Sequence, residues 1–244
     1  MNLETLEYPP LTEDIEEAKN HLDKYGMALI ANVLSVGEID EMDKRLNEQF
    51  LGEEKYKVGS KIRGDEGLGV ESSDEEKVSR LVWNLINKGD CFLKLIDHPK
   101  ILPLIQHIIG EKVSLCSMGA HMNGSGNERM ALHQDQWPLV PHPMDFPFMA
   151  NVMYLISDNS PENGGTRLIP GSHKWPLIDY RTANGEEIQK MANSLTAPKG
   201  TAIVWEGRLW HGNGLNRSGS MRSNISTAFL LSLIHISEPT RLNP

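Results

Sequence analysis

Residues 148–156 read Phe-Met-Ala-Asn-Val-Met-Tyr-Leu-Ile, a short apolar run of a kind that favours a β-strand. Similar short runs recur along the second half of the chain, where Gly, Pro and Asn separate them as turn signals. Short strands at such spacing are typical of a β-sandwich or barrel. Strands are also predicted at residues 112–122, 129–133, 166–169, 194–197, 201–205 and 222–231.

The first half of the chain is predicted to be mainly helical. Apolar residues over 12–25 recur at helical spacing, Gly26 ends this helix, and residues 27–33 then indicate a strand. Ser35 can cap a second helix that reaches about residue 50, because Glu38 stands where a capping box requires an acidic partner. Further helical stretches are predicted at 78–87, 90–97 and 99–109.

The chain is expected to form one domain over residues 1–231, with a helical part at 1–110 and a β core at 111–231. Residues 52–77 are rich in Gly, Glu, Lys and Ser, which predicts a mobile loop that can act as a lid. Residues 232–244 resemble translated cloning-vector sequence, so we interpret them as a cloning-derived tail and expect the natural reading frame to be cut near Leu230.

Composition excludes several classes of partner. A formal net charge of -9 without a basic stripe argues against nucleic-acid binding, which needs clustered Lys and Arg. The two cysteines, Cys91 and Cys116, are too few for a disulfide framework. The longest apolar run, residues 228–236, is far shorter than the roughly 20 residues of a membrane helix. These features predict a cytoplasmic protein that binds neither nucleic acid nor a membrane.

His133-Gln134-Asp135 is the strongest chemical signal in the sequence. It follows a predicted strand, where residues i and i+2 project to the same face, so one imidazole and one carboxylate converge. His211, after a later strand, would complete a triad of two histidines and one carboxylate that leaves metal positions open. The tripeptide His21-Leu22-Asp23 has the same spacing but lies in a predicted helix, where its two side chains diverge.

Further elements surround this pattern in order. Residues 163–174 read Asn-Gly-Gly-Thr-Arg-Leu-Ile-Pro-Gly-Ser-His-Lys, and Arg222 follows His211 by eleven residues. Over residues 120–228 the chain resembles the phytanoyl-CoA dioxygenase family. The resemblance implies a double-stranded β-helix, a cupin-like jelly roll, that carries N-terminal helices. It also implies Fe(II) held by His133, Asp135 and His211, with 2-oxoglutarate and O2 as co-substrates.

Three residues are predicted to bind 2-oxoglutarate. Arg222 opens an apolar strand, and its planar guanidinium matches the far carboxylate of this co-substrate in shape and charge. The resemblance implies the same role for Gln134 and for Asn213, which stands two residues after His211. The alternative for Arg222 is an ordinary surface arginine at the start of a strand.

These residues predict an Fe(II)- and 2-oxoglutarate-dependent dioxygenase that hydroxylates a small metabolite and releases succinate and CO2. Related halogenases replace the carboxylate ligand by a small residue, so Asp135 favours oxygen insertion. One alternative is a non-catalytic cupin-like binding protein or an inactive relic of such an oxygenase. Another is an enzyme with the same cofactors that carries out desaturation, epimerisation or halogenation. Neither the substrate nor the oligomeric state follows from the sequence.

Overall fold

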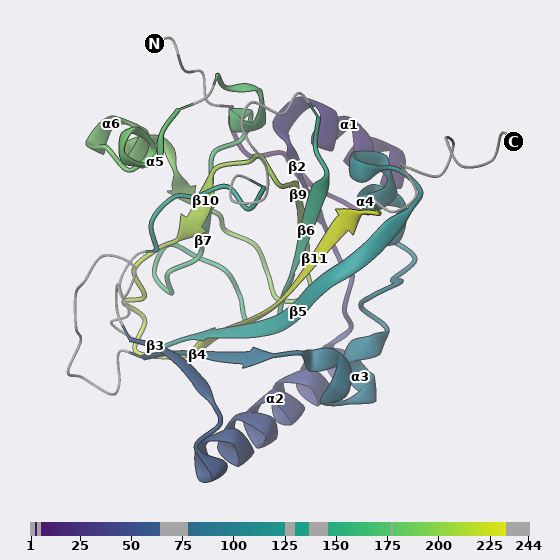
Figure 1. Cartoon of the computed structure of the whole chain (residues 1–244), viewed down its shortest axis with the longest axis vertical. Coiled ribbons are helices and arrows are strands. Elements are labelled where there is room, and N and C mark those ends of the chain that lie inside the picture. The colour runs from purple at the N-terminus through teal and green to yellow at the C-terminus, as the bar shows by residue number, and fades with distance from the viewer. Residues whose placement is uncertain are drawn as a thin grey trace, which may run out of the picture.

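Figure 1 shows the computed structural model of the chain, which describes residue 3 and residues 6–63, 78–124, 130–136, 146–176 and 178–232. One large sheet dominates it, and a smaller sheet lies beside it. The large sheet has eight strands. In spatial order these are β1 (Leu11–Thr12), β2 (Met27–Ile30), β9 (Ala202–Glu206), β6 (Met149–Leu155), β11 (Arg222–Leu231), β5 (Val113–Asn123), β4 (Val78–Trp83) and β3 (Ser60–Arg63).

The small sheet has three strands, in the order β10 (His211–Asn213), β7 (Thr166–Leu168) and β8 (Asn193–Ser194). An isolated antiparallel bridge joins His133 to His211 and so adds the segment around His133 to its edge. From β5 onward the chain passes repeatedly between the sheets: β5, β6, β9 and β11 lie in the large sheet, while His133, β7, β8 and β10 belong to the small one.

Eight helical segments accompany the sheets in the described residues. Asp14 caps the first by accepting two backbone N–H bonds, and Ser35 and Glu38 form the expected capping box of the second. The α-helices are α1 (Ile15–Tyr25), α2 (Val36–Tyr56), α3 (Asp90–Leu93), α4 (Leu102–Ile109), α5 (Tyr180–Ala183) and α6 (Glu186–Met191), and the 3-10 turns are Leu85–Asn87 and Ser172–Lys174. No described helix has the length and apolar character that crossing a membrane requires.

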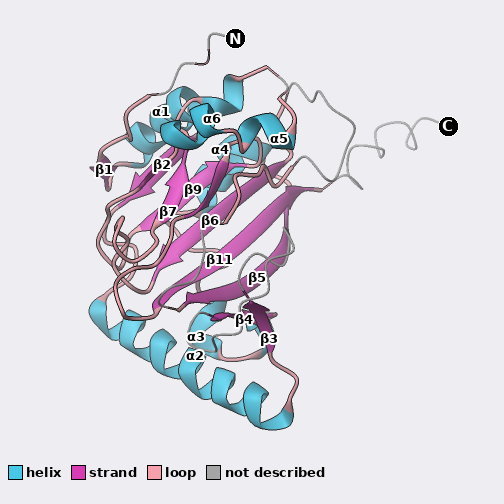
Figure 2. Cartoon of the chain, turned by 90° about the vertical axis from the view of Figure 1, so that its left-hand side faces the viewer, coloured by secondary structure: helices cyan, strands magenta, loops and turns pink. Residues whose placement is uncertain are grey.

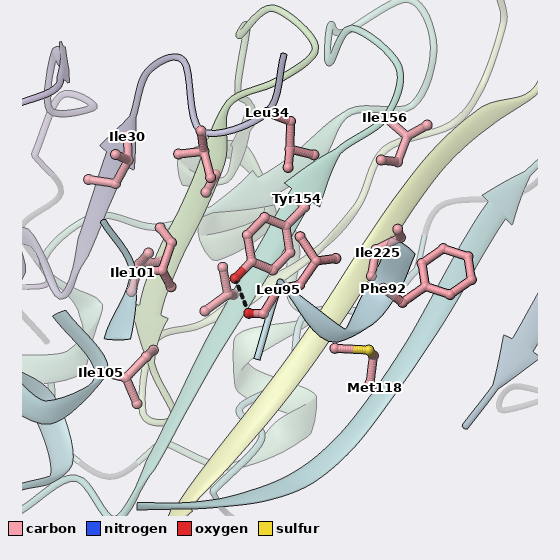
Figure 3. Packing of buried hydrophobic residues seen from close by; sticks show 14 of the residues in the cluster. Ile30, Leu34, Phe92, Leu95, Ile101, Ile105, Met118, Tyr154, Ile156 and Ile225 are labelled. Atoms are coloured by element: carbon pink, nitrogen blue, oxygen red, sulfur yellow. Dashed lines mark hydrogen bonds between the residues drawn. The ribbon is translucent and has the colours of Figure 1, made fainter. Parts of the chain in front are cut away.

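Both faces of the central strands are buried. Along β6, Val152 and Tyr154 belong to a core shared with the helices, whereas Met153 and Leu155 pack with Leu168 of the small sheet. Figure 3 shows Tyr154 within the helix-side core, where its hydroxyl donates a 2.7 Å hydrogen bond to the Leu95 carbonyl. Because side chains alternate along a strand, those of the central strands that point away from the helices fill the space between the two sheets. Figure 2 shows α2 running across the far end of the molecule, below β3 and β4.

The first half of the chain is less helical than expected. Residues 78–87 form β4 and a 3-10 turn, so the helix predicted there is wrong. Leu81 and Val82 are both buried, since β4 pairs with β5 and is covered on two faces, and such a continuous apolar run cannot be distinguished from a helix by its periodicity. Strand β2 confirms the strand predicted at residues 27–33, whereas β1, β3 and β4 were not expected in this half of the chain.

The predicted loop at 52–77 is also partly regular. Helix α2 continues to Tyr56, and residues 60–63 form β3, which pairs with β4. Residues 64–77 lie outside the described residues, as do the tail 233–244 and Arg129. Helices α5 and α6, within the predicted β core, were not expected.

Candidate metal and co-substrate site

His133 and His211 are brought together by their own backbones. Each donates its N–H to the other's carbonyl, at 2.9 and 3.0 Å, in the bridge at the edge of the small sheet. Their rings lie on the same side, with centroids 4.3 Å apart. Sheet pairing therefore brings together two residues that lie far apart in the sequence, and their imidazoles face one point.

Asp135 reaches the same point. Its Oδ1 lies 3.6 Å from Nε2 of His133, and its Oδ2 lies 3.2 Å from Nε2 of His211. One ligand atom from each of the three residues lies within 4.8 Å of the others, so this cluster could hold a metal ion. The side chains of the other H-x-D tripeptide, His21 and Asp23, do not converge on one point. His21 is buried on α1 near Glu17, while Asp23 pairs with His107.

Backbone contacts orient both imidazoles. Nδ1 of His133 lies 3.1 Å from the Ala131 carbonyl, and Nδ1 of His211 lies 3.0 Å from the Leu209 carbonyl. A carbonyl can only accept, so each Nδ1 carries the proton and each Nε2 presents a lone pair to the common point. Metal-bound histidines are commonly held by such a contact through their other ring nitrogen.

Charge and burial suit this arrangement. Burial and the nearby His211 lower the pKa of His133 to about 4, which keeps it neutral. Burial would raise the pKa of Asp135, but His211 and His133 outweigh it and lower that pKa to about 2. The Asp135 carboxylate in turn raises the pKa of His211 against the effect of burial. Two imidazole nitrogens and one ionised carboxylate are a donor set that fits Fe(II).

Arg222 is 1% exposed at the start of β11. Its Nε donates to the Asn163 carbonyl at 3.2 Å, and its Nη1 lies 3.5 Å from Oδ1 of Asn159. Among the described residues no carboxylate pairs with it. Burial lowers the pKa of Arg222 to about 10, so the guanidinium stays charged at neutral pH. A buried cation that meets only neutral acceptors is suited to an anionic ligand.

A cavity of about 200 Å³ between the sheets contains the triad. Asn213 of β10 lines it, two residues from His211 on the same face of the strand. Gln134 does not line it, and its amide nitrogen donates to the Arg208 carbonyl. His121 of β5 does line it, with its pKa lowered to about 4 by burial and by Arg222.

Sequence reasoning missed several residues that line this cavity. Asn151 of β6 donates a 2.9 Å hydrogen bond to Oδ2 of Asp135, and the Trp205 ring lies 5.1 Å from that of His211. Trp83, at the end of β4, lies against Gly119 and makes an edge contact with His121. A lone Asn inside the apolar run 148–156 was the one available signal, because a buried amide needs a polar partner.

The comparison with known families agrees with this geometry. The model of the phytanoyl-CoA dioxygenase family matches residues 22–224, which include the triad and Arg222. The chain belongs to the phytanoyl-CoA dioxygenase family. Among curated members, dioxygenase af480 of Aspergillus fumigatus is 30% identical over 210 residues, covering 84% of this chain. The chain spans 63% of the length of that relative.

Solved structures show the same fold at low identity. HygX from Streptomyces hygroscopicus, crystallised with nickel, 2-oxoglutarate and hygromycin B, superposes with a TM-score of 0.67 at 16% identity, covering 89% of this chain and 87% of that one. The non-haem α-ketoglutarate-dependent carbocyclase SnoK from nogalamycin biosynthesis gives a TM-score of 0.68 at 18% identity, covering 94% and 91%. The family of this chain thus shares its fold with proteins that bind a metal and 2-oxoglutarate.

Proposed function

We propose that this protein is an Fe(II)- and 2-oxoglutarate-dependent dioxygenase that hydroxylates a small-molecule metabolite. One observation carries the proposal: His133, Asp135 and His211 present two imidazole nitrogens and a carboxylate to one point inside a cavity. Such a triad occupies one face of a metal ion and leaves the other positions open. Membership of the phytanoyl-CoA dioxygenase family supports the same reaction class.

The protein's own residues would hold and orient the reactants. When bound, iron and 2-oxoglutarate supply the oxidation of the co-substrate by O2 to succinate and CO2, coupled to hydroxylation of a C–H bond. Arg222 would bind the far carboxylate of 2-oxoglutarate, because it is a buried cation that meets only neutral acceptors among the described residues. This contact would fix the distance of the co-substrate from the triad.

The proposal also includes Asn213 and Gln134 as residues that bind the co-substrate. Asn213 faces the cavity beside His211, from where its amide would contact the co-substrate. The role of Gln134 is proposed on the family resemblance alone, because its side chain does not line the cavity and its amide nitrogen donates to the Arg208 carbonyl. Both side chains can donate and accept, so neither adds charge to the site.

The cavity wall favours a substrate with an apolar part. Trp83, Met130 and Met149 line it, and no Lys or Arg does among the described residues. A charged substrate group placed against this wall would lose its hydration without gaining a counter-ion, because Arg222 does not line the cavity and is assigned to the co-substrate. HygX was crystallised with hygromycin B as well as nickel and 2-oxoglutarate, so a protein of this fold can bind an organic molecule in addition to the metal and the co-substrate.

We also propose the finer architecture that the sequence predicts. Strands that pass repeatedly between two facing sheets support a double-stranded β-helix. The large sheet takes β1 to β4 from the first half of the chain and β5, β6, β9 and β11 from the second, which supports one domain over residues 1–231. In this proposal residues 232–244 are a tail outside that domain.

Experiment can distinguish the proposed hydroxylation from other reactions with the same cofactors and from a protein without catalytic activity. Asp135 occupies the carboxylate position, which disfavours halogenation, whereas the carbocyclase SnoK shows that the fold supports other oxidations. The rival binding protein or inactive relic would lack turnover altogether. No feature of the described site indicates such a loss of turnover, because each residue of the triad has its donor atom facing the common point.

The test is succinate release from 2-oxoglutarate under Fe(II) and O2, screened with a metabolite library and followed by product mass. Asp135→Ala should abolish release, whereas Asp23→Ala, which alters the H-x-D tripeptide of α1, should leave it unchanged. A product heavier by one oxygen atom identifies hydroxylation, and a product lighter by two hydrogens identifies desaturation. Failure of the wild type to bind both metal and 2-oxoglutarate would overturn the proposal.

A further inference from the structure

Asn151 is a buried polar residue inside an apolar strand. It is 5% exposed, and its neighbours in β6 are Ala150 and Val152, which face the helices. The alternation of the strand turns the Asn151 side chain the other way, into the cavity between the sheets. Burying an amide costs free energy unless it is hydrogen-bonded, so the position requires a polar partner.

That partner is the candidate metal ligand itself. Nδ2 of Asn151 donates a 2.9 Å hydrogen bond to Oδ2 of Asp135, across 16 residues of sequence. Trp205 of β9 stands directly opposite Asn151 in the register of the sheet. Asp135 lies in a bend and not in a strand, so its backbone alone does not fix where its carboxylate points.

We propose that Asn151 is a positioning residue that sets the rotation of the Asp135 carboxylate for metal binding. A carboxylate held at one oxygen by a rigid strand presents the other to the ion in a single geometry. Freed of this contact, the carboxylate can rotate and bind through both oxygens or not at all. Because Asn151 is neutral, it fixes the orientation and leaves the carboxylate its full negative charge. The inference rests on the metal-binding part of the proposed function.

The experiment compares metal affinity in three proteins. Asn151→Leu keeps the shape of the side chain and removes the N–H donor, while Val152→Ala removes packing from the helix-side face of the same strand. Co(II), a redox-stable probe, is titrated into each protein by calorimetry, and its visible absorption reports the coordination geometry. Thermal melts without metal check that each protein is folded. If Asn151→Leu does not fold, Asn151→Ser replaces it, because its shorter hydroxyl falls short of Asp135.

We expect the Asn151 variant to bind Co(II) about 10- to 100-fold more weakly than the wild type, with an altered absorption spectrum. Val152→Ala should melt at a lower temperature but bind Co(II) with unchanged affinity. A folded Asn151 variant with wild-type affinity and spectrum would overturn the inference while leaving the proposed function intact. A wild type that does not bind Co(II) would instead overturn the proposed function.

Discussion

His133 and His211 exchange two backbone hydrogen bonds, at 2.9 and 3.0 Å, and thereby hold their imidazole rings 4.3 Å apart. The bridge is made by main-chain atoms, so it survives the removal of either side chain. A mutation can therefore remove either imidazole ligand and keep the fold, which is unusual for buried polar clusters.

His133→Ala and His211→Ala should each abolish metal binding and succinate release. Their melting temperatures without metal should stay close to that of the wild type, since the backbone bridge remains. Calorimetry with Co(II) and a thermal melt measure the two effects separately. Retention of wild-type Co(II) affinity in either variant would show that the metal binds elsewhere.

Arg222→Leu should raise the KM for 2-oxoglutarate far more than it changes metal affinity. Loss of a desolvated, charged contact costs on the order of 2 to 5 kcal/mol. Arg222→Lys should recover part of the loss, because an ammonium keeps the charge but not the bidentate geometry. The assignment is wrong if the Arg222→Leu enzyme has an unchanged KM for 2-oxoglutarate.

Gly119→Val should impair substrate-dependent turnover and spare the binding of Co(II). A Cβ at this position would lie 3.0 Å from Cε3 of Trp83, so the indole must shift, and the added side chain also enters the cavity that Gly119 lines. Gly37→Ala is the matched control, since nothing lies within 4 Å of its Cβ. Turnover in the presence of a substrate found by the library screen, measured against uncoupled succinate release, reports the effect. Equal turnover in both variants would show that the substrate does not contact the cavity wall formed by Gly119 and Trp83.

Gly26→Ala should destabilise the protein by about 1 to 3 kcal/mol. Gly26 ends α1 with a φ of 73°, and a Cβ there would lie 2.5 Å from Nδ1 of the buried His173. Gly219 has a φ of 71° but open space around it, so Gly219→Ala measures the backbone strain alone. Urea unfolding of both variants separates strain from the clash. A loss no larger for Gly26 than for Gly219 would mean that His173 moves aside freely.

The free energy of unfolding should depend on pH through the ionisation of Glu38. A hydrogen bond from Lys94, followed by contacts from Ser35, lowers the pKa of Glu38 to about 2. Because the folded-state pKa lies below that of the unfolded chain, the carboxylate stabilises the fold at neutral pH. This contribution is lost as the pH falls from about 4.5 through 2.

Glu38→Gln keeps the capping geometry and removes the charge. The side chains of Glu38 and Lys94 are 35% and 37% exposed, so solvent limits the loss at pH 7 to roughly 1 kcal/mol. The difference in unfolding free energy from the wild type should shrink at pH 4. Glu186→Gln, in a largely exposed ion pair, should show no measurable loss. A pH-independent difference would assign the Glu38 effect to helix capping alone.

The sequence by itself determined the local features. Ser35 and Glu38 form their capping box because both partners lie within one helical turn, and Gly26 ends α1 because it tolerates a positive φ. The helix around His21 was sufficient to separate the side chains of the other H-x-D pair. These outcomes depend on geometry over a few residues, which the sequence specifies directly.

Only the tertiary structure decided what depends on the register of distant strands. Residues 78–83 became a strand because β5 supplied hydrogen bonds and the sheet buried both of its faces, an outcome that overrides local propensity. The position of Trp205 opposite Asn151 follows from the pairing of β6 with β9, and the contact of Asn151 with Asp135 joins β6 to the bend after His133. A shift of one residue in that register would turn each side chain to the opposite face, and no local signal in the sequence fixes it.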